Sequence, residues 1–313
     1  MTGAAAVHER AEILRLARLL RKQPEELAFL LEVDDADLRA FRAQVTESLF
    51  DAYGDALRRL GAAAKLIPSP IIALVGQKAF GPLLCARIAG ELDPGKAVDI
   101  AKRLSVTFLA DVAVELDPRR AQRIIEALPT QTIVSTSVEL ADRGDWITLG
   151  AFVGYLPVDK LRHCLRALSD EHILRTAFAV DDEGAIPTVI DALAADRLKS
   201  LLHTASEAGL WPTLLRDIAG QLREDQTAEV AAHLADLGDD VLAGVLEVAA
   251  EHGLWEPFLP IAAELPQQSQ QALADAAGQL SSHARSECAE LAGRLGILDR
   301  LGPLAETLRE SVS

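Results

Sequence analysis

Apolar positions along this chain recur three, four and seven residues apart in short runs, which is the spacing of one helix face. Proline and glycine separate these runs at close intervals, and the sequence has no alternating apolar–polar runs joined by hairpin turns. The pattern therefore predicts an all-α protein made of many short amphipathic helices. Thr130–Val138 is the one β-leaning stretch, and the repeat alignment below places it on a helix.

The helical pattern repeats with a period of 24 residues. Ser69-Pro70, Asp93-Pro94 and Asp117-Pro118 stand 24 residues apart, and each pair predicts a helix N-cap followed by proline at the first helical position. Each unit then reads as two helices of roughly ten residues joined by minimal turns. Small or apolar residues behind each pair align as Ala73, Ala97 and Ala121; Phe80, Leu104 and Leu128; Cys85, Leu109 and Ile133; Ala89, Ala113 and Ser137; and Leu92, Leu116 and Leu140.

A second repeat, with a period near 44 residues, follows in the C-terminal third. Gly209-Leu210-Trp211 returns as Gly253-Leu254-Trp255, Gly296 begins a weaker third copy, and Gly144 stands in a related earlier position. Glycine suits the left-handed position that ends a helix. The fourteen prolines fall at or near predicted helix starts, so we expect none in the middle of a helix, where proline costs about 3 kcal/mol.

A short helix with one apolar face cannot bury that face alone, and stacked repeats supply the missing neighbour. We therefore predict an α-solenoid, a right- or left-handed superhelix of about twenty short helices with an N-terminal helical cap. Residues 1–65 form the cap, including predicted helices Glu9–Lys22 and Asp35–Leu49. Residues 66–206 carry the 24-residue repeats, and residues 207–313 carry the longer ones.

Two segments, Glu91–Ala97 and Glu115–Ala121, resemble a step in the intracellular N-terminal domain of MgtE-type magnesium transporters: leucine, Asp-Pro, two further residues, then alanine. The resemblance covers about Ser69–Leu168. It implies a superhelix of short helices and does not imply transport. In the transporters this acidic domain takes part in magnesium-responsive regulation, so the resemblance adds a divalent-cation-responsive domain to the functional alternatives.

Composition excludes several classes of protein. Half of the residues are hydrophobic, which is too many for intrinsic disorder. With 31 Lys and Arg against 47 Asp and Glu, the net charge is −16, which argues against nucleic acid as a partner. It favours instead a protein partner with a basic patch, bound less tightly as salt rises. The three cysteines are far apart, which gives neither a disulfide framework nor paired metal ligands.

The sequence predicts no integral membrane segment and a cytoplasmic location. Charged residues interrupt Met1–Arg10, which therefore does not resemble a signal peptide. The strongest apolar run, Leu66–Gly76, has eleven residues and contains Pro68 and Pro70, so it is too short to span a bilayer. We interpret it as the start of a buried helix, with contact to a membrane surface as the alternative left open.

Catalytic motifs and cofactor-binding loops are absent from the sequence, so we predict no catalytic residue and no cofactor. Our main hypothesis is a non-enzymatic interaction scaffold or regulator. The most aromatic stretch supplies its candidate partner-binding residues, Arg143, Trp146, Phe152 and Tyr155.

Two alternatives remain beside the scaffold. A carrier or sensor of a hydrophobic small molecule would use the apolar segment 66–90, including Ile71, Ile72 and Phe80. A weak magnesium or calcium site would use the acidic cluster Asp181, Asp182 and Glu183, although carboxylates at helix boundaries more often cap free N–H groups. An enzyme on helical repeats, such as a DNA glycosylase, would need a basic face.

Overall fold

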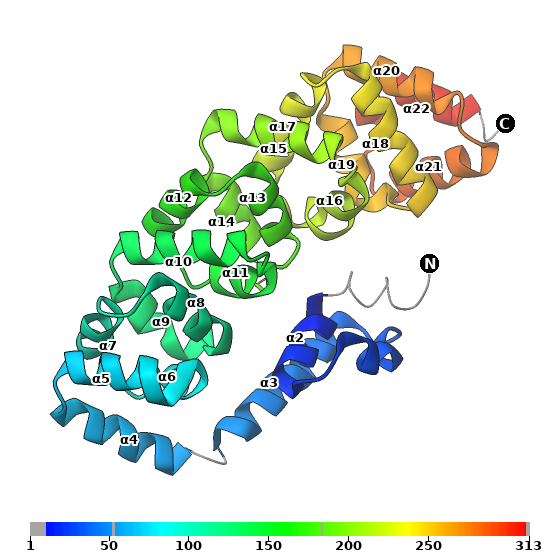
Figure 1. The fold of residues 1–313 in the computed structure, drawn as a ribbon. Helices are drawn as coiled ribbons and strands as arrows, with labels where there is room; N and C mark the ends of the chain where they lie inside the picture. The colour runs from blue at the N-terminus through cyan, green and yellow to red at the C-terminus, as the bar shows by residue number, and fades with distance from the viewer. Residues whose placement is uncertain (1–10, 52–53, 183, 311–313) are drawn as a thin grey trace. The chain divides into compact units, whose positions relative to one another are not determined.

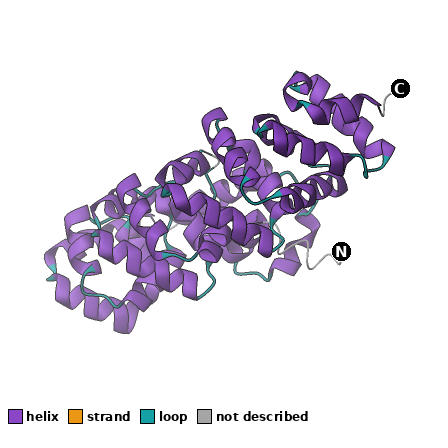
Figure 2. Ribbon diagram, turned by 90° about the horizontal axis from the view of Figure 1, so that it is seen from above, coloured by secondary structure: helices purple, strands orange, loops and turns teal. Residues whose placement is uncertain are grey.

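The computed structural model describes residues 11–51, 54–182 and 184–310, and this part of the chain is all-helical. It contains twenty-one α-helices and no strand, as Figure 2 shows by its colouring. The all-α prediction is confirmed. Thr130–Val138, the β-leaning stretch, lies within helix α10 (Thr130–Asp142), as the repeat alignment predicted.

The helices follow the predicted spacing closely. The N-terminal segment holds α2 (Ala11–Leu20), η1 (Pro24–Leu30), α3 (Asp35–Asp51) and α4 (Gly54–Leu66). The 24-residue units hold α5 (Ser69–Val75), the π-helical turn η2 (Gly76–Phe80), α6 (Gly81–Ala89), α7 (Pro94–Ala101), α8 (Val106–Glu115), α9 (Pro118–Ala127) and α10. Helices α11 (Trp146–Val153), α12 (Val158–Ala167), α13 (Asp170–Ala177), α14 (Ala185–Ala192) and α15 (Ala195–Glu207) come next. The last are α16 (Trp211–Asp217), η3 (Ala219–Gln221), α17 (Glu224–Ala235), α18 (Asp239–His252), α19 (Trp255–Glu264), α20 (Gln267–Ala277), α21 (Ser282–Arg294), η4 (Leu298–Leu301) and α22 (Pro303–Glu310).

Packing divides the chain into two compact units. Unit 1 comprises residues 1–168 and 179–181, and unit 2 comprises residues 169–178 and 182–313. The boundaries predicted after residues 65 and 206 mark changes of repeat period rather than of packing, and they stay predictions.

Within each unit a helix packs mainly against the next helix but one. In unit 1 one row is α5, α7 and α9, and the second row is α4, α6, α8, α10 and α12 (Figure 1). Unit 2 has the rows α13, α15, α17, α19 and α16, α18, α20, α22. Such rows of alternate helices fit a solenoid-like arrangement, in which each short helix buries its apolar face against its repeat neighbours.

Side-chain caps mark two of the helix starts in the 24-residue repeat. Asp93 accepts a hydrogen bond from the Lys96 N–H, and Asp117 accepts one from the Arg119 N–H, each with proline at the next position. The prediction for Ser69-Pro70 is wrong, because the N-cap there is Pro68 and the helix starts one residue earlier. Ser69 is buried, and its hydroxyl lowers the pKa of Asp99 by hydrogen bonding to that carboxylate.

The glycines of the second repeat adopt the predicted left-handed conformation. Gly144, Gly209, Gly253 and Gly296 have φ between +64° and +71°, so each can end a helix where a side chain would be strained. The expectation for prolines fails at Pro260, which lies inside α19. It lies on the exposed face of α19, where water can hydrate the carbonyl that loses its N–H partner, while the opposite face of the helix is buried.

Unit 2 is organised around a continuous apolar core. The aligned Trp211 and Trp255 both belong to it, and Trp255 is fully buried against Phe258 and donates a hydrogen bond to Glu287. Repetition of the tryptophan therefore serves packing in this unit, as large rings fill the space between helices.

The N-terminal helices dock onto α11 and residues 179–181, all within unit 1. Arg42 donates hydrogen bonds to both Asp181 oxygens at 2.8 and 2.9 Å and to Glu12 at 3.0 Å. Arg15 pairs with Glu12 at 2.5 Å and donates to the Ala179 carbonyl oxygen. Glu12 and Arg15 are almost completely buried, so each charge depends on its partners.

Candidate ligand cavity

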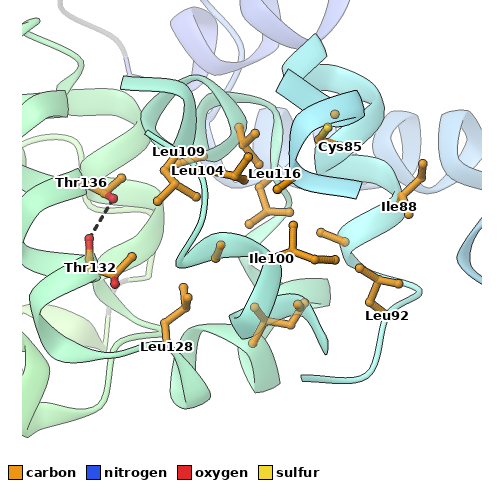
Figure 3. Close-up of a pocket in the computed structure, with 18 of the residues that line it drawn as sticks. Cys85, Ile88, Leu92, Ile100, Leu104, Leu109, Leu116, Leu128, Thr132 and Thr136 are labelled. Carbon is orange, nitrogen blue, oxygen red and sulfur yellow. Dashed lines mark hydrogen bonds between the residues drawn. The ribbon is translucent and has the colours of Figure 1, made fainter. Parts of the chain in front are cut away.

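An apolar cavity of about 320 Å³ lies between the two helix rows of unit 1, where a fully packed array would have its core. One row contributes lining residues from α5, α7 and α9, and the other contributes them from α6, α8 and α10. Figure 3 shows part of this lining. Cavities of a few hundred cubic ångströms lined by apolar side chains are typical small-molecule sites. An apolar cavity about half this size can stay dry and bind benzene.

The cavity wall is made by the 24-residue repeat itself. Of the fifteen aligned positions, all but Ala121 line the cavity, and Ala121 packs in the small core beside it. Equivalent positions of successive repeats therefore follow one another along the cavity wall. Figure 3 shows Ile100, Leu104, Leu109, Leu116 and Leu128 among the lining residues.

Small side chains at inward positions leave this space open. Ala89 and Ala113 line the cavity from α6 and α8 with a single methyl group each. Leu92, Leu104 and Leu109 remain only partly buried although the pattern places them inside. Protein interiors are normally packed as densely as organic crystals, so the void leaves these leucines with fewer contacts than a core residue makes.

The mouth of the cavity is formed by residues 60–80. The exposed lining residues of the described chain all fall in this segment, and they are Leu60, Ala63, Ile67, Ile71 and Phe80. The remaining lining residues are buried or half-buried. A molecule that enters the cavity would therefore pass between α4, α5 and η2.

The hydroxyl groups of the cavity lining are confined to the end opposite the mouth. Thr132, Thr136 and Ser137 of α10 carry the hydroxyl groups among the lining residues, and none of the lining residues is charged. The Thr136 hydroxyl donates to the Thr132 carbonyl oxygen at 2.8 Å, drawn as the dashed line in Figure 3. Burial raises the pKa of the Cys85 thiol, which keeps this lining group uncharged as well.

The structure brings together four of the seven residues proposed to bind a ligand or partner. Ile71, Ile72, Phe80 and Phe152 all line the cavity. Tyr155 packs on the neighbouring cluster around Ile125 and Ile133.

Arg143 and Trp146 lie apart from the cavity lining. Arg143 forms ion pairs with Asp111 at 2.6 Å and Glu139 at 2.7 Å on the outer side of α8 and α10. Trp146 begins α11 behind the Asp145 cap and is half-buried. Their proposed role in partner binding stays a prediction.

The acidic cluster is engaged in structural contacts. Asp181 is held by Arg15 and Arg42; burial opposes its charge, but the two guanidinium groups outweigh burial and lower its pKa. Asp182 accepts the Gly184 N–H, and Glu183 lies outside the described residues. In the described ranges no three His, Cys, Asp or Glu side chains are grouped to hold a metal ion. The cation site stays a prediction without a supporting cluster.

The sequence pattern does not single out most of the lining residues as ligand contacts. The repeat alignment contains them, but apolar residues at helical spacing indicate a buried face whether that face meets side chains or a void. Only the pairing of Ala89 with Ala113 and Ser137 at one aligned position hinted that the interior lacks bulk. A run of small residues is common in packed helices, so this hint could not predict a cavity.

Comparison of the chain with protein-family models, curated proteins and solved structures finds no match. The resemblance to the MgtE N-terminal domain gains no support from these comparisons and stays a prediction. One helical run in the described chain, Ser69–Ala89, has the length and apolar composition to cross a membrane, with 22% of its window buried inside the protein.

Proposed function

We propose that this protein binds an uncharged, mainly apolar small molecule in the cavity of unit 1, as a carrier or sensor. The observation that supports this most directly is that all but one of the fifteen aligned repeat positions line an apolar cavity of about 320 Å³. Apolar side chains that face this space lack packing partners, and a bound apolar molecule would supply the missing contacts.

The chemistry of the wall limits the ligand. A charged group inside would face only apolar side chains, hydroxyl groups and the Cys85 thiol, and an unpaired buried charge is strongly disfavoured. A single hydroxyl or carbonyl group is compatible with the cavity, because Thr132, Thr136 and Ser137 provide hydrogen-bonding groups at its α10 end. An alkyl or isoprenoid chain ending in one such group fits this description.

The test is binding of an uncharged fluorescent probe, N-phenyl-1-naphthylamine, to the full chain. We expect saturable binding of one probe per chain, displaced by dodecanol. Native mass spectrometry of freshly purified protein provides a second readout, with a bound organic mass as the supporting result. Probe fluorescence that rises linearly without saturation, together with an empty protein in several preparations, would overturn the proposal.

A matched pair of variants locates the site. Ala113→Phe places a ring in the middle of the cavity and should reduce probe affinity at least tenfold while leaving helicity and thermal stability unchanged or raised, since cavity-filling substitutions often stabilise. Ala127→Phe adds the same ring at an exposed position of α9 away from the cavity and should bind like the original chain. Equal binding by both variants would exclude the cavity as the site.

A further inference from the structure

The mouth of the cavity carries a concentration of exposed apolar side chains. Twelve large hydrophobic residues in the described chain are exposed, and six of them fall within residues 60–80. Leu66 is 88% exposed, Leu74 60% and Ile71 52%. A concentration of exposed apolar side chains in one segment is typical of an interaction site.

The charge of the same segment is opposite to that of the chain. Residues 56–90 contain five Lys and Arg and no Asp or Glu, although the whole chain has 47 acidic residues and a net charge of −16. Lys65 and Lys78 are both exposed. Ile71, Leu74 and Lys78 follow one another at three- and four-residue spacing, which places a cation beside apolar side chains on one helical face.

From these two observations we infer that residues 56–90, which we name the basic apolar edge, dock on the surface of a bilayer that contains anionic phospholipid. Apolar side chains such as Leu66 and Leu74 enter the boundary between headgroups and acyl chains, and Lys65 and Lys78 contact the lipid phosphates. Apolar insertion combined with attraction to anionic headgroups is the recognised physics of interfacial helices.

The acidic remainder of the chain does not prevent this contact. At physiological ionic strength the Debye length is about 8 Å, so exposed carboxylates farther than this from the bilayer are largely screened. A second copy of the chain is a poor occupant of the same edge. A symmetric contact would bring the exposed cations Lys65 and Lys78 of one copy toward the same cations of the other.

The packing of the segment favours lying on the membrane over crossing it. Helix α5 packs on α7, and α6 packs on both α4 and α8. Ser69, Ala73, Ala86 and Ile88 are buried inside unit 1, so a crossing helix would have to leave these contacts. The π-helical turn η2 and Gly81, whose φ is +75°, also interrupt the run in its middle.

The test uses the full chain and sedimentation with phosphatidylcholine vesicles that contain or lack phosphatidylglycerol. We expect binding to the anionic vesicles that weakens as salt rises and little binding to the neutral ones. Replacing both cations, Lys65→Gln with Lys78→Gln, should weaken binding about thirtyfold, because each cation near an anionic surface contributes about 1 kcal/mol.

The apolar contribution is tested by Leu66→Glu with Leu74→Glu, which should abolish vesicle binding. Both positions are exposed, so circular dichroism should show an unchanged fold. Leu295→Glu, at an exposed leucine of unit 2, is the matched control and should bind normally. If the Leu66 and Leu74 variant still binds vesicles while the lysine variant does not, positive charge alone drives the binding. The inferred docking of apolar side chains into a membrane surface is then wrong.

Two further outcomes would also overturn the inference. Resistance of the bound chain to alkaline carbonate would indicate a spanning helix, and a dimer dispersed by the Leu66 and Leu74 substitutions would indicate a second copy as the occupant. Vesicle binding does not require an occupied cavity. The Ala113→Phe variant should therefore still bind vesicles, which separates failure of this inference from failure of the proposed ligand site.

Discussion

Individual charged residues in unit 1 differ sharply in how much the fold depends on them. Glu12 is buried and satisfies both Arg15 and Arg42, whereas Glu26 forms an exposed pair with Lys22. Removing one partner of a buried pair leaves an uncompensated charge in the protein, which costs far more than the loss of a solvated pair. Two glutamates within fifteen positions of each other therefore contribute very differently to the stability of the fold.

Glu12→Gln should lower the free energy of unfolding by about 3 kcal/mol, because Arg15 keeps its charge but loses its main counterion. Urea unfolding followed by circular dichroism gives the change, and faster hydrogen exchange in α2 gives its location. The matched substitution Glu26→Gln should change stability by about 0.5 kcal/mol or less. Equal effects of the two substitutions would show that the Glu12 cluster does not hold the N-terminal helices.

Asp181 should make unit 1 sensitive to acid. Its pKa is lowered in the folded state, so the unfolded chain takes up the proton first as the pH falls. Its contribution is therefore fully present above the ordinary aspartate pKa of 3.8 and is lost as the pH falls through the lower folded value. Urea midpoints of the original chain and of Asp181→Asn should converge on acidification. A constant gap between them would contradict this assignment, and Asp275→Asn, at an exposed site, is the control.

At the scale of elements, glycines at superficially similar places have opposite structural roles. Gly150 lies inside α11, and a Cβ there would overlap the Ala179 carbonyl, because residues 179–181 pass directly over this helix. Gly244 lies inside α18, and a Cβ there would meet nothing within 4 Å. Helix propensity alone would favour alanine at both positions, but the close approach of another segment makes alanine destabilising at Gly150.

Gly150→Ala should destabilise the protein by about 2 kcal/mol or more, because the clash is with backbone and cannot be relieved by a rotamer change. Gly244→Ala should stabilise it by about 0.5–1 kcal/mol through reduced freedom of the unfolded chain. Thermal unfolding of the two variants measures the direction of each change in stability. Stabilisation by both substitutions would show that residues 179–181 do not rest on α11.

At the scale of the whole molecule, the two units use the same kind of short helix for different ends. Unit 2 closes its repeats around tryptophan, phenylalanine and leucine and builds a dense core. Unit 1 lines the space between its rows with alanine and half-buried leucine, and leaves a cavity. A molecule bound in that cavity would therefore act on one unit and not on the other.

Saturation with the apolar probe should slow hydrogen exchange in α5–α10 and leave α18–α22 unchanged. Ligand at one hundred times its Kd stabilises the state that binds it by about 2.7 kcal/mol, which is ample for exchange to detect. Protection spread evenly over both units would indicate binding elsewhere, and the Ala113→Phe variant should show clearly weaker protection at the same probe concentration.

The sequence by itself determined the helices and their order. The 3.6-residue apolar spacing, the Asp-Pro starts and the glycine stops act within a few residues, so the pattern predicted the all-α fold, the starts of α7 and α9 and the left-handed glycines. Local rules failed at Ser69, which bonds to Asp99, and at Pro260, whose helix is held by packing on its opposite face.

Only the tertiary structure decided whether aligned apolar positions meet each other or a void. Leu104, Leu109 and Leu128 carry the same pattern as packed core residues, yet they line a cavity between the two helix rows. The pairing of Arg42 with both Glu12 and Asp181 was equally hidden, because it joins residues far apart in the chain. Short-range spacing fixes which face of a helix is apolar, whereas three-dimensional packing fixes what that face touches.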